Sequence, residues 1–109
     1  MNINAGELAG NMLNAMQGVL SDKWPEIKEY AESEAQKLAQ SLVMIEALKV
    51  ANKIDPEEAA LHLSIQKNAS RMVLLTIKGL GVLAVEQALN AALEVVKETV
   101  NTALGFTLI

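Results

Sequence analysis

The first residues to test for chemistry are histidine and its acidic neighbours, and the chain has a single histidine, His62, four residues after Glu58. In a helix this spacing places both side chains on one face, which is how helical metal sites present their ligands. Di-iron helical bundles need two Glu-x-x-His pairs and two further glutamates, and this sequence contains no Glu-x-x-His. We therefore interpret His62 as a solvated residue near the start of a helix, and we expect no metal ion and no cofactor.

Carboxyl groups that take part in acid–base catalysis require surroundings that shift their pKa. Glu46 and Glu86 each lie among apolar neighbours and come closest to this requirement, but we expect both at the rim of a core or an interface. The serines lack the elbow sequence that presents a nucleophile to a base. Gly79-Leu80-Gly81 lacks the third glycine of a dinucleotide-binding loop, and Lys78 lacks the pattern of a phosphate-binding loop. We predict that the protein is not an enzyme.

The composition favours a small all-α domain. The chain has 109 residues, of which 51% are hydrophobic and 3% aromatic. That length suits one domain over residues 1–109, and a core of aliphatic side chains and alanine suits close helix packing. Two prolines and six glycines are too few to separate many short strands. The absence of cysteine excludes disulfides and thiolate chemistry.

Charge and hydropathy argue against two kinds of partner. The net charge is −4 and the nine basic residues form no stripe, so we expect no nucleic-acid binding. The apolar window over residues 72–85 is interrupted by Lys78 and is shorter than the ~20 residues of a membrane-spanning helix. No Lys or Arg precedes Lys23, so we expect no secretory signal with a charged beginning and predict a cytoplasmic protein.

The apolar periodicity predicts three helices, over residues 5–20, 24–53 and 56–104. The first two are separated by a break near Pro25, because proline is tolerated only in the first turn of a helix. Residues 52–55 then predict a tight reversal that pairs the second helix with the third as an antiparallel hairpin.

The third predicted helix has the clearest start signal in the chain. Asp55 is a preferred N-cap residue, and Pro56 occupies the first helical position. Glu58 adds negative charge at the positive end of the helix dipole. These three residues predict a helix that begins at Pro56.

Gly79 and Gly81 leave two architectures open. We favour a helix that continues through both glycines, at a cost of about 2 kcal/mol relative to two alanines, because residues 82–85 offer no side chain to cap a new helix. The result is a long antiparallel hairpin that associates into a four-helix-type bundle. The alternative is a compact monomeric four-helix bundle with a turn at Gly79–Gly81. Pro25 and the two glycines are therefore predicted to be hinge or close-packing positions.

A hairpin of two long arms cannot enclose all of its apolar surface, so we predict a homo-oligomer, with a dimer favoured. The last residues, 106–109, are also apolar, and three roles are open to them: folding back, reaching a second copy, or docking another protein. The predicted interface residues lie in the middle of the third helix: Met72, Val73, Leu74, Ile77, Leu80, Val82 and Leu83.

Three functions remain compatible with these patterns. The preferred one is a structural or adaptor protein that acts through self-association and helix-face interaction. The first alternative is a membrane-surface protein that lays residues 5–20 and 72–93 into a bilayer, although the acidic net charge of the chain does not favour it. The second alternative is a carrier of an apolar ligand between helices, for which methionines would provide an adaptable lining. Four methionines are available for that lining: Met12, Met16, Met44 and Met72.

Overall fold

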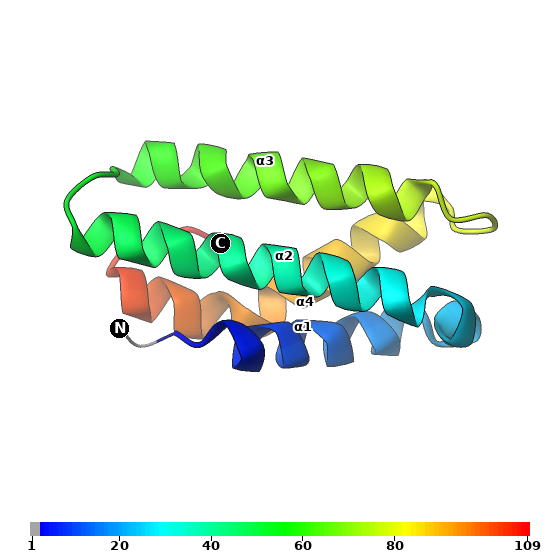
Figure 1. Ribbon diagram of the computed structural model, residues 1–109. Coiled ribbons are helices and arrows are strands. Elements are labelled where there is room, and N and C mark those ends of the chain that lie inside the picture. The colour runs from blue at the N-terminus through cyan, green and yellow to red at the C-terminus, as the bar shows by residue number, and fades with distance from the viewer. Residues whose placement is uncertain (1–2) are drawn as a thin grey trace.

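The computed structural model describes residues 3–109 and contains four α-helices joined by short turns (Figure 1). Met1 and Asn2, which the predicted domain included, lie outside the described residues. The chain has no strand over the range described and its four helices pack against one another, so the predicted all-α helical-bundle class is confirmed. The elements in chain order are α1 (Ala5–Val19), the 3₁₀ turn η1 (Ser21–Lys23), α2 (Trp24–Val50), α3 (Pro56–Leu75) and α4 (Val82–Leu104).

The four helices are not equally enclosed. Figure 1 shows α2 between α3 on one side and α1 on the other, with α4 crossing behind. α1 packs closely against both α2 and α4, whereas α3 packs mainly against α2 and less against α4. The bundle measures 43 × 22 × 18 Å. α3 therefore leaves more of its surface uncovered than α1 does.

The predicted break near Pro25 is present. α1 ends at Val19, η1 turns the chain, and α2 begins at Trp24, so that Pro25 falls in the first turn of α2. A proline at this place removes no helical hydrogen bond, because the first N–H groups of a helix have no partner within it. Trp24 packs, partly buried, against the core at this corner.

The predicted reversal after α2 is present and contains a left-handed residue. Asn52 has a φ of 59° and donates its N–H to the Lys49 carbonyl at 3.0 Å. Lys53 donates its N–H to the Leu48 carbonyl at 2.8 Å. These two bonds form a Schellman motif, which satisfies the last carbonyls of α2 locally.

The start of α3 is a capping box. Glu58 donates its backbone N–H to Asp55 Oδ1 at 2.7 Å, and Asp55 donates its own N–H to Glu58 Oε1 at 3.1 Å. Pro56 stands in the first turn. The reciprocal bonds satisfy two N–H groups that the helix itself cannot, and the predicted helix start is confirmed.

The predicted single helix over residues 56–104 is wrong. α3 ends at Leu75, and the chain reverses through residues 76–81 before α4 begins. Gly79 has a φ of +89°, a conformation that costs any residue with a side chain about 1–2 kcal/mol. The structure thus has the alternative architecture, a four-helix bundle with a turn at Gly79–Gly81.

A helix does begin after Gly81, although residues 82–85 offer no capping side chain. This residue is the N-cap of α4 with extended backbone and no side-chain hydrogen bond. Glycine is only a few tenths of a kcal/mol worse at an N-cap than the preferred polar residues, so their absence is a weak signal. Burial is the stronger effect: after the reversal Leu80 is 9% exposed and Val85 is fully buried in the chain's own core.

Among the helix pairs, α1 and α4 make the most extensive contact. Alanines on the inner face of α4 let the two helix backbones approach closely. α1 buries Leu8, Met12 and Met16, and α4 buries Val85, Ala88, Leu89, Ala92, Leu93, Val96, Val100 and Leu104.

The apolar window over residues 72–85 is divided among the end of α3, the turn and the start of α4. Among the residues described, no helix combines the length and the apolar character needed to cross a lipid bilayer.

The C-terminal residues fold back along α4. Gly105 ends the helix with a φ of 80°. Asn101 Oδ1 accepts the N–H of Leu108 at 2.8 Å and the N–H of Ile109 at 3.1 Å. Phe106, Leu108 and Ile109 pack against the core. Of the three predicted roles for this tail, the structure has the first.

Candidate interaction surface

The predicted interface residues are divided between the core and the surface. Leu74 is fully buried and Leu80 nearly so, hence both belong to the chain's own core. The exposed residues are Met72 at 66%, Val82 at 64% and Leu83 at 72% of their surface. Val73 and Ile77 are partly buried. Of the predicted interface residues, Met72, Val82 and Leu83 are therefore the most accessible to a partner in this structure.

Two exposed residues that the sequence analysis did not select lie on the same face as Met72. Leu61 is 61% exposed and Ile65 is 69% exposed, both on α3. With Ala69, also exposed, they recur at steps of four, four and three residues, the spacing of a single helix face. We call Leu61, Ile65, Ala69 and Met72 the α3 stripe.

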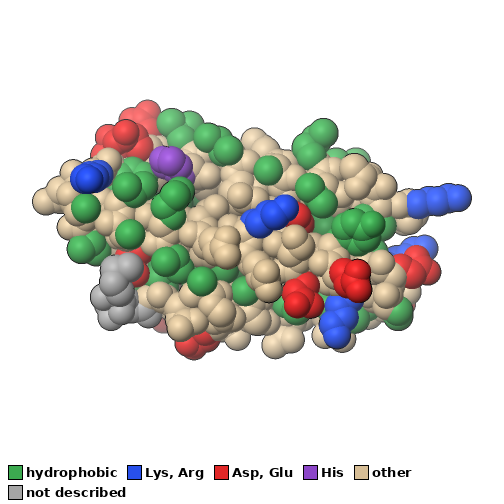
Figure 2. Space-filling model, in the orientation of Figure 1, with side chains coloured by type: hydrophobic (Ala, Val, Ile, Leu, Met, Phe, Trp, Pro, Cys, Tyr) green, Lys and Arg blue, Asp and Glu red, His purple; other side chains and the backbone are tan. Residues whose placement is uncertain are grey.

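The α3 stripe points away from the bundle. The residues of α3 that are buried, Ala59, Leu63, Ser70 and Leu74, follow the same spacing on the opposite side of the helix. At about 100° per residue the two sets lie roughly half a turn apart around the axis. Figure 2 shows hydrophobic side chains along the upper edge of the molecule, where α3 lies. This second apolar face was the sequence signal that could have identified Leu61 and Ile65.

Polar side chains link α3 to α4. Arg71 Nε lies 2.5 Å from Glu86 Oε1, and Arg71 Nη2 donates to Glu86 Oε2 at 3.3 Å. Lys67 Nζ donates to Asn90 Oδ1 at 3.4 Å, and Arg71 also donates to Asn68. The Arg71 hydrogen bond holds the pKa of Glu86 below its ordinary value. Glu86 is partly exposed, so this residue stands at a rim, as predicted.

Two glutamates of α2 are buried, each 2% exposed: Glu34 and Glu46. The prediction that Glu46 lies at a rim is therefore wrong. Glu34, which the sequence analysis did not select, accepts a hydrogen bond from Lys37 Nζ at 3.2 Å through Oε2, while Oε1 has no hydrogen-bond partner. A buried ion pair contributes little net stability, because the cost of removing its charges from water offsets the attraction between them.

The geometry does not assemble a metal centre around His62. His62 and Glu58 are both exposed, and Glu58 is engaged in the capping box. Within residues 3–109, no group of three His, Asp or Glu side chains could hold a metal ion.

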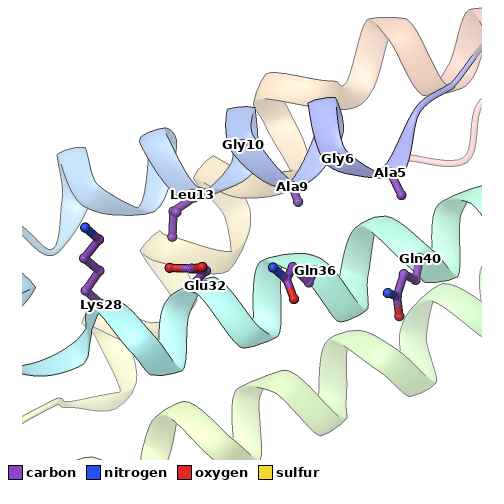
Figure 3. A pocket seen from close by; sticks show the side chains of 9 residues that line it. All are labelled: Ala5, Gly6, Ala9, Gly10, Leu13, Lys28, Glu32, Gln36 and Gln40. Atoms are coloured by element: carbon purple, nitrogen blue, oxygen red, sulfur yellow. The ribbon is translucent and has the colours of Figure 1, made fainter.

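An open groove of about 670 Å³ runs between α1 and α2. In Figure 3, Ala5, Ala9 and Leu13 point from α1 toward the groove. The opposite wall on α2 is polar and is formed by Lys28, Glu32, Gln36 and Gln40.

That groove does not match the predicted carrier of an apolar ligand. Met12 and Met16 are fully buried in the core, while Met44 and Met72 lie on the surface at 45% and 66% exposure, and none of the four lines the groove. The predicted methionine lining is therefore absent from it.

Comparison with protein-family models, curated proteins and solved structures gives no match for this chain. The class that the geometry defines is an all-α four-helix bundle with one helix that is apolar on two opposite faces.

Proposed function

We propose that this is a non-enzymatic structural or adaptor protein that acts by self-association and by binding other helices through an exposed apolar helix face. The single observation that carries the proposal is the α3 stripe. Its three large side chains, Leu61, Ile65 and Met72, are each about two-thirds exposed on one face. Isolated exposed apolar residues are normal on a protein surface, whereas an aligned row along a helix is typical of a contact site. The proposal includes a cytoplasmic location, which a cysteine-free composition permits.

The size of the stripe sets an upper limit on the strength of self-association. Full burial of a Leu, Ile or Met side chain contributes about 1.5–3 kcal/mol, so covering the exposed two-thirds contributes about 1–2 kcal/mol for each. Two copies together bring six such side chains, hence about 6–12 kcal/mol. Association costs roughly 4–15 kcal/mol in lost motion. A stripe-only contact is therefore expected to have at best a micromolar dissociation constant.

Sedimentation equilibrium across a wide range of protein concentration tests the proposal. The expected result is a mass that rises reversibly from one copy toward two. A mass of one copy at every concentration would refute self-association. Flotation with vesicles of neutral and anionic lipid tests the membrane-surface alternative in the same samples. If the protein floats with the vesicles and stays monomeric without them, the membrane-surface function replaces the proposed one.

A further inference from the structure

The α3 stripe is self-complementary when it is reversed. Its midpoint falls between Gln66 and Lys67, and Leu61 and Met72 lie equally far from that midpoint on either side. In an antiparallel pair of α3 helices, Leu61 of one copy therefore meets Met72 of the other. Ile65 then lies opposite the short side chains Asn68 and Ala69, which leave room for it. A two-fold axis generates both contacts twice, as closed dimers require.

The charges at the two ends of α3 also favour the antiparallel arrangement. The N-terminal end carries Asp55, Glu57 and Glu58, all exposed. Beyond the C-terminal end, the turn carries the exposed Lys78. An antiparallel pair brings each acidic end toward the other copy's Lys78 and aligns the helix dipoles favourably. A parallel pair would place the carboxylates of one copy beside the same carboxylates of the other.

Between Leu61 and Met72 no charged side chain interrupts the stripe. The two cations in the middle of α3, Lys67 and Arg71, are directed toward α4 by their bonds to Asn90 and Glu86. The contact surface between Leu61 and Met72 consequently carries no charged side chain over about 16 Å, at ~1.5 Å per residue, and Asn68 is the polar residue within it.

From the register and the charge pattern together, we infer that the partner of the α3 stripe is a second copy of this chain, bound through α3 in antiparallel orientation about a two-fold axis near Gln66. The inference rests on the proposed self-association and adds to it the surface, the partner and the orientation.

Ile65→Glu tests the surface. The substitution places two carboxylates near the two-fold axis. We expect the dissociation constant of the dimer to be at least about 100-fold higher than that of wild type. Val95→Glu is the matched control, because Val95 is an exposed (51%) apolar helical residue on α4. Its dissociation constant should stay within about threefold of wild type. Circular dichroism checks that both variants keep their helix content.

Thiol cross-linking tests the orientation of the pair. Because the chain has no cysteine of its own, each introduced cysteine is the sole thiol that reacts. Leu61→Cys and Met72→Cys variants are mixed and treated with a thiol cross-linker that spans under about 10 Å. This span is shorter than the ~16 Å between positions 61 and 72 along the helix axis, so the reagent joins only positions that lie side by side. Antiparallel pairing predicts a product that joins a Leu61→Cys chain to a Met72→Cys chain, because position 61 of one copy lies beside position 72 of the other. Preferential linkage of Leu61→Cys chains to each other would overturn the antiparallel arrangement.

The outcomes separate the inference from the function on which it rests. A wild-type protein that is always monomeric refutes the proposed function. A wild-type dimer that survives Ile65→Glu and gives no mixed cross-link keeps the proposed function and refutes α3 as its surface.

Discussion

Replacement of Gly79 by alanine tests the reversal that determines the topology. At a φ of +89° alanine costs about 1–2 kcal/mol more than in a right-handed conformation. Its Cβ would lie 3.1 Å from Lys23 Nζ, the far end of a flexible side chain that can move away. The lower entropy of the unfolded alanine chain offsets about 0.4–1 kcal/mol. We therefore expect Gly79→Ala to lower the free energy of unfolding by about 1 kcal/mol.

Gly10→Ala is the matched control. Gly10 lies inside α1, and a Cβ added there meets nothing within 4 Å. Alanine in a helix interior is more stable than glycine by roughly 0.5–1 kcal/mol. The same chemical change is thus expected to destabilise the protein at Gly79 and to stabilise it at Gly10.

Urea unfolding followed by circular dichroism, at one fixed protein concentration, measures both variants, and a thermal scan should show shifts of about 4 °C per kcal/mol. The two architectures predict opposite signs at Gly79, because a helix that continued through this position would gain stability from alanine. If Gly79→Ala raised the midpoint as Gly10→Ala does, the turn would be absent in solution and the four-helix connection would be wrong.

Three further predictions follow from individual contacts. Asp55→Ala removes the capping box and should cost about 1 kcal/mol of unfolding free energy in urea titrations, whereas Glu57→Ala, which breaks no cap bond, should change it little. The pKa of Glu86 is lowered by Arg71, so the stabilisation from this pair is present above the pKa of an unfolded glutamate and is lost as the pH falls through the lower folded value. NMR titration of the Glu86 carboxyl should show that low midpoint, and Arg71→Met should raise it; an unchanged midpoint would exclude Arg71 as the cause. Glu34→Met should leave the free energy of unfolding unchanged or raise it by about 1 kcal/mol, because Lys37 is 52% exposed and stays hydrated without its partner. A clear loss of unfolding free energy in urea would show that the buried carboxyl is needed.

Much of the fold followed from short-range signals. The capping box at Asp55, the reversal at Asn52 and the corner at Pro25 all occur where the residue types place them, and the bonds that form them join residues no more than five positions apart. Such bonds depend little on the rest of the molecule, so the sequence was sufficient to predict them. The all-α class followed in the same way from periodicity and composition.

The candidate surface was only partly predictable. The sequence identified Met72, Val82 and Leu83, which are exposed, together with Leu74 and Leu80, which are buried. Apolar side chains look alike in a sequence whether they face the core or a partner. Leu61 and Ile65 were not predicted, because they lie outside the most apolar window, residues 72–85, and have polar residues as sequence neighbours.

The sequence by itself determined the start of α3 at Pro56, the breaks near Pro25 and Asn52, and the aliphatic residue types that form the core. Only the tertiary structure decided that the chain reverses at Gly79, that Glu34 and Glu46 are buried, and that Arg71 pairs with Glu86. The physical reason is distance along the chain. Helix caps depend on hydrogen bonds between near neighbours in the chain, whereas the reversal depends on the burial of α4 against α1. The residues of α1 lie more than sixty positions before those of α4.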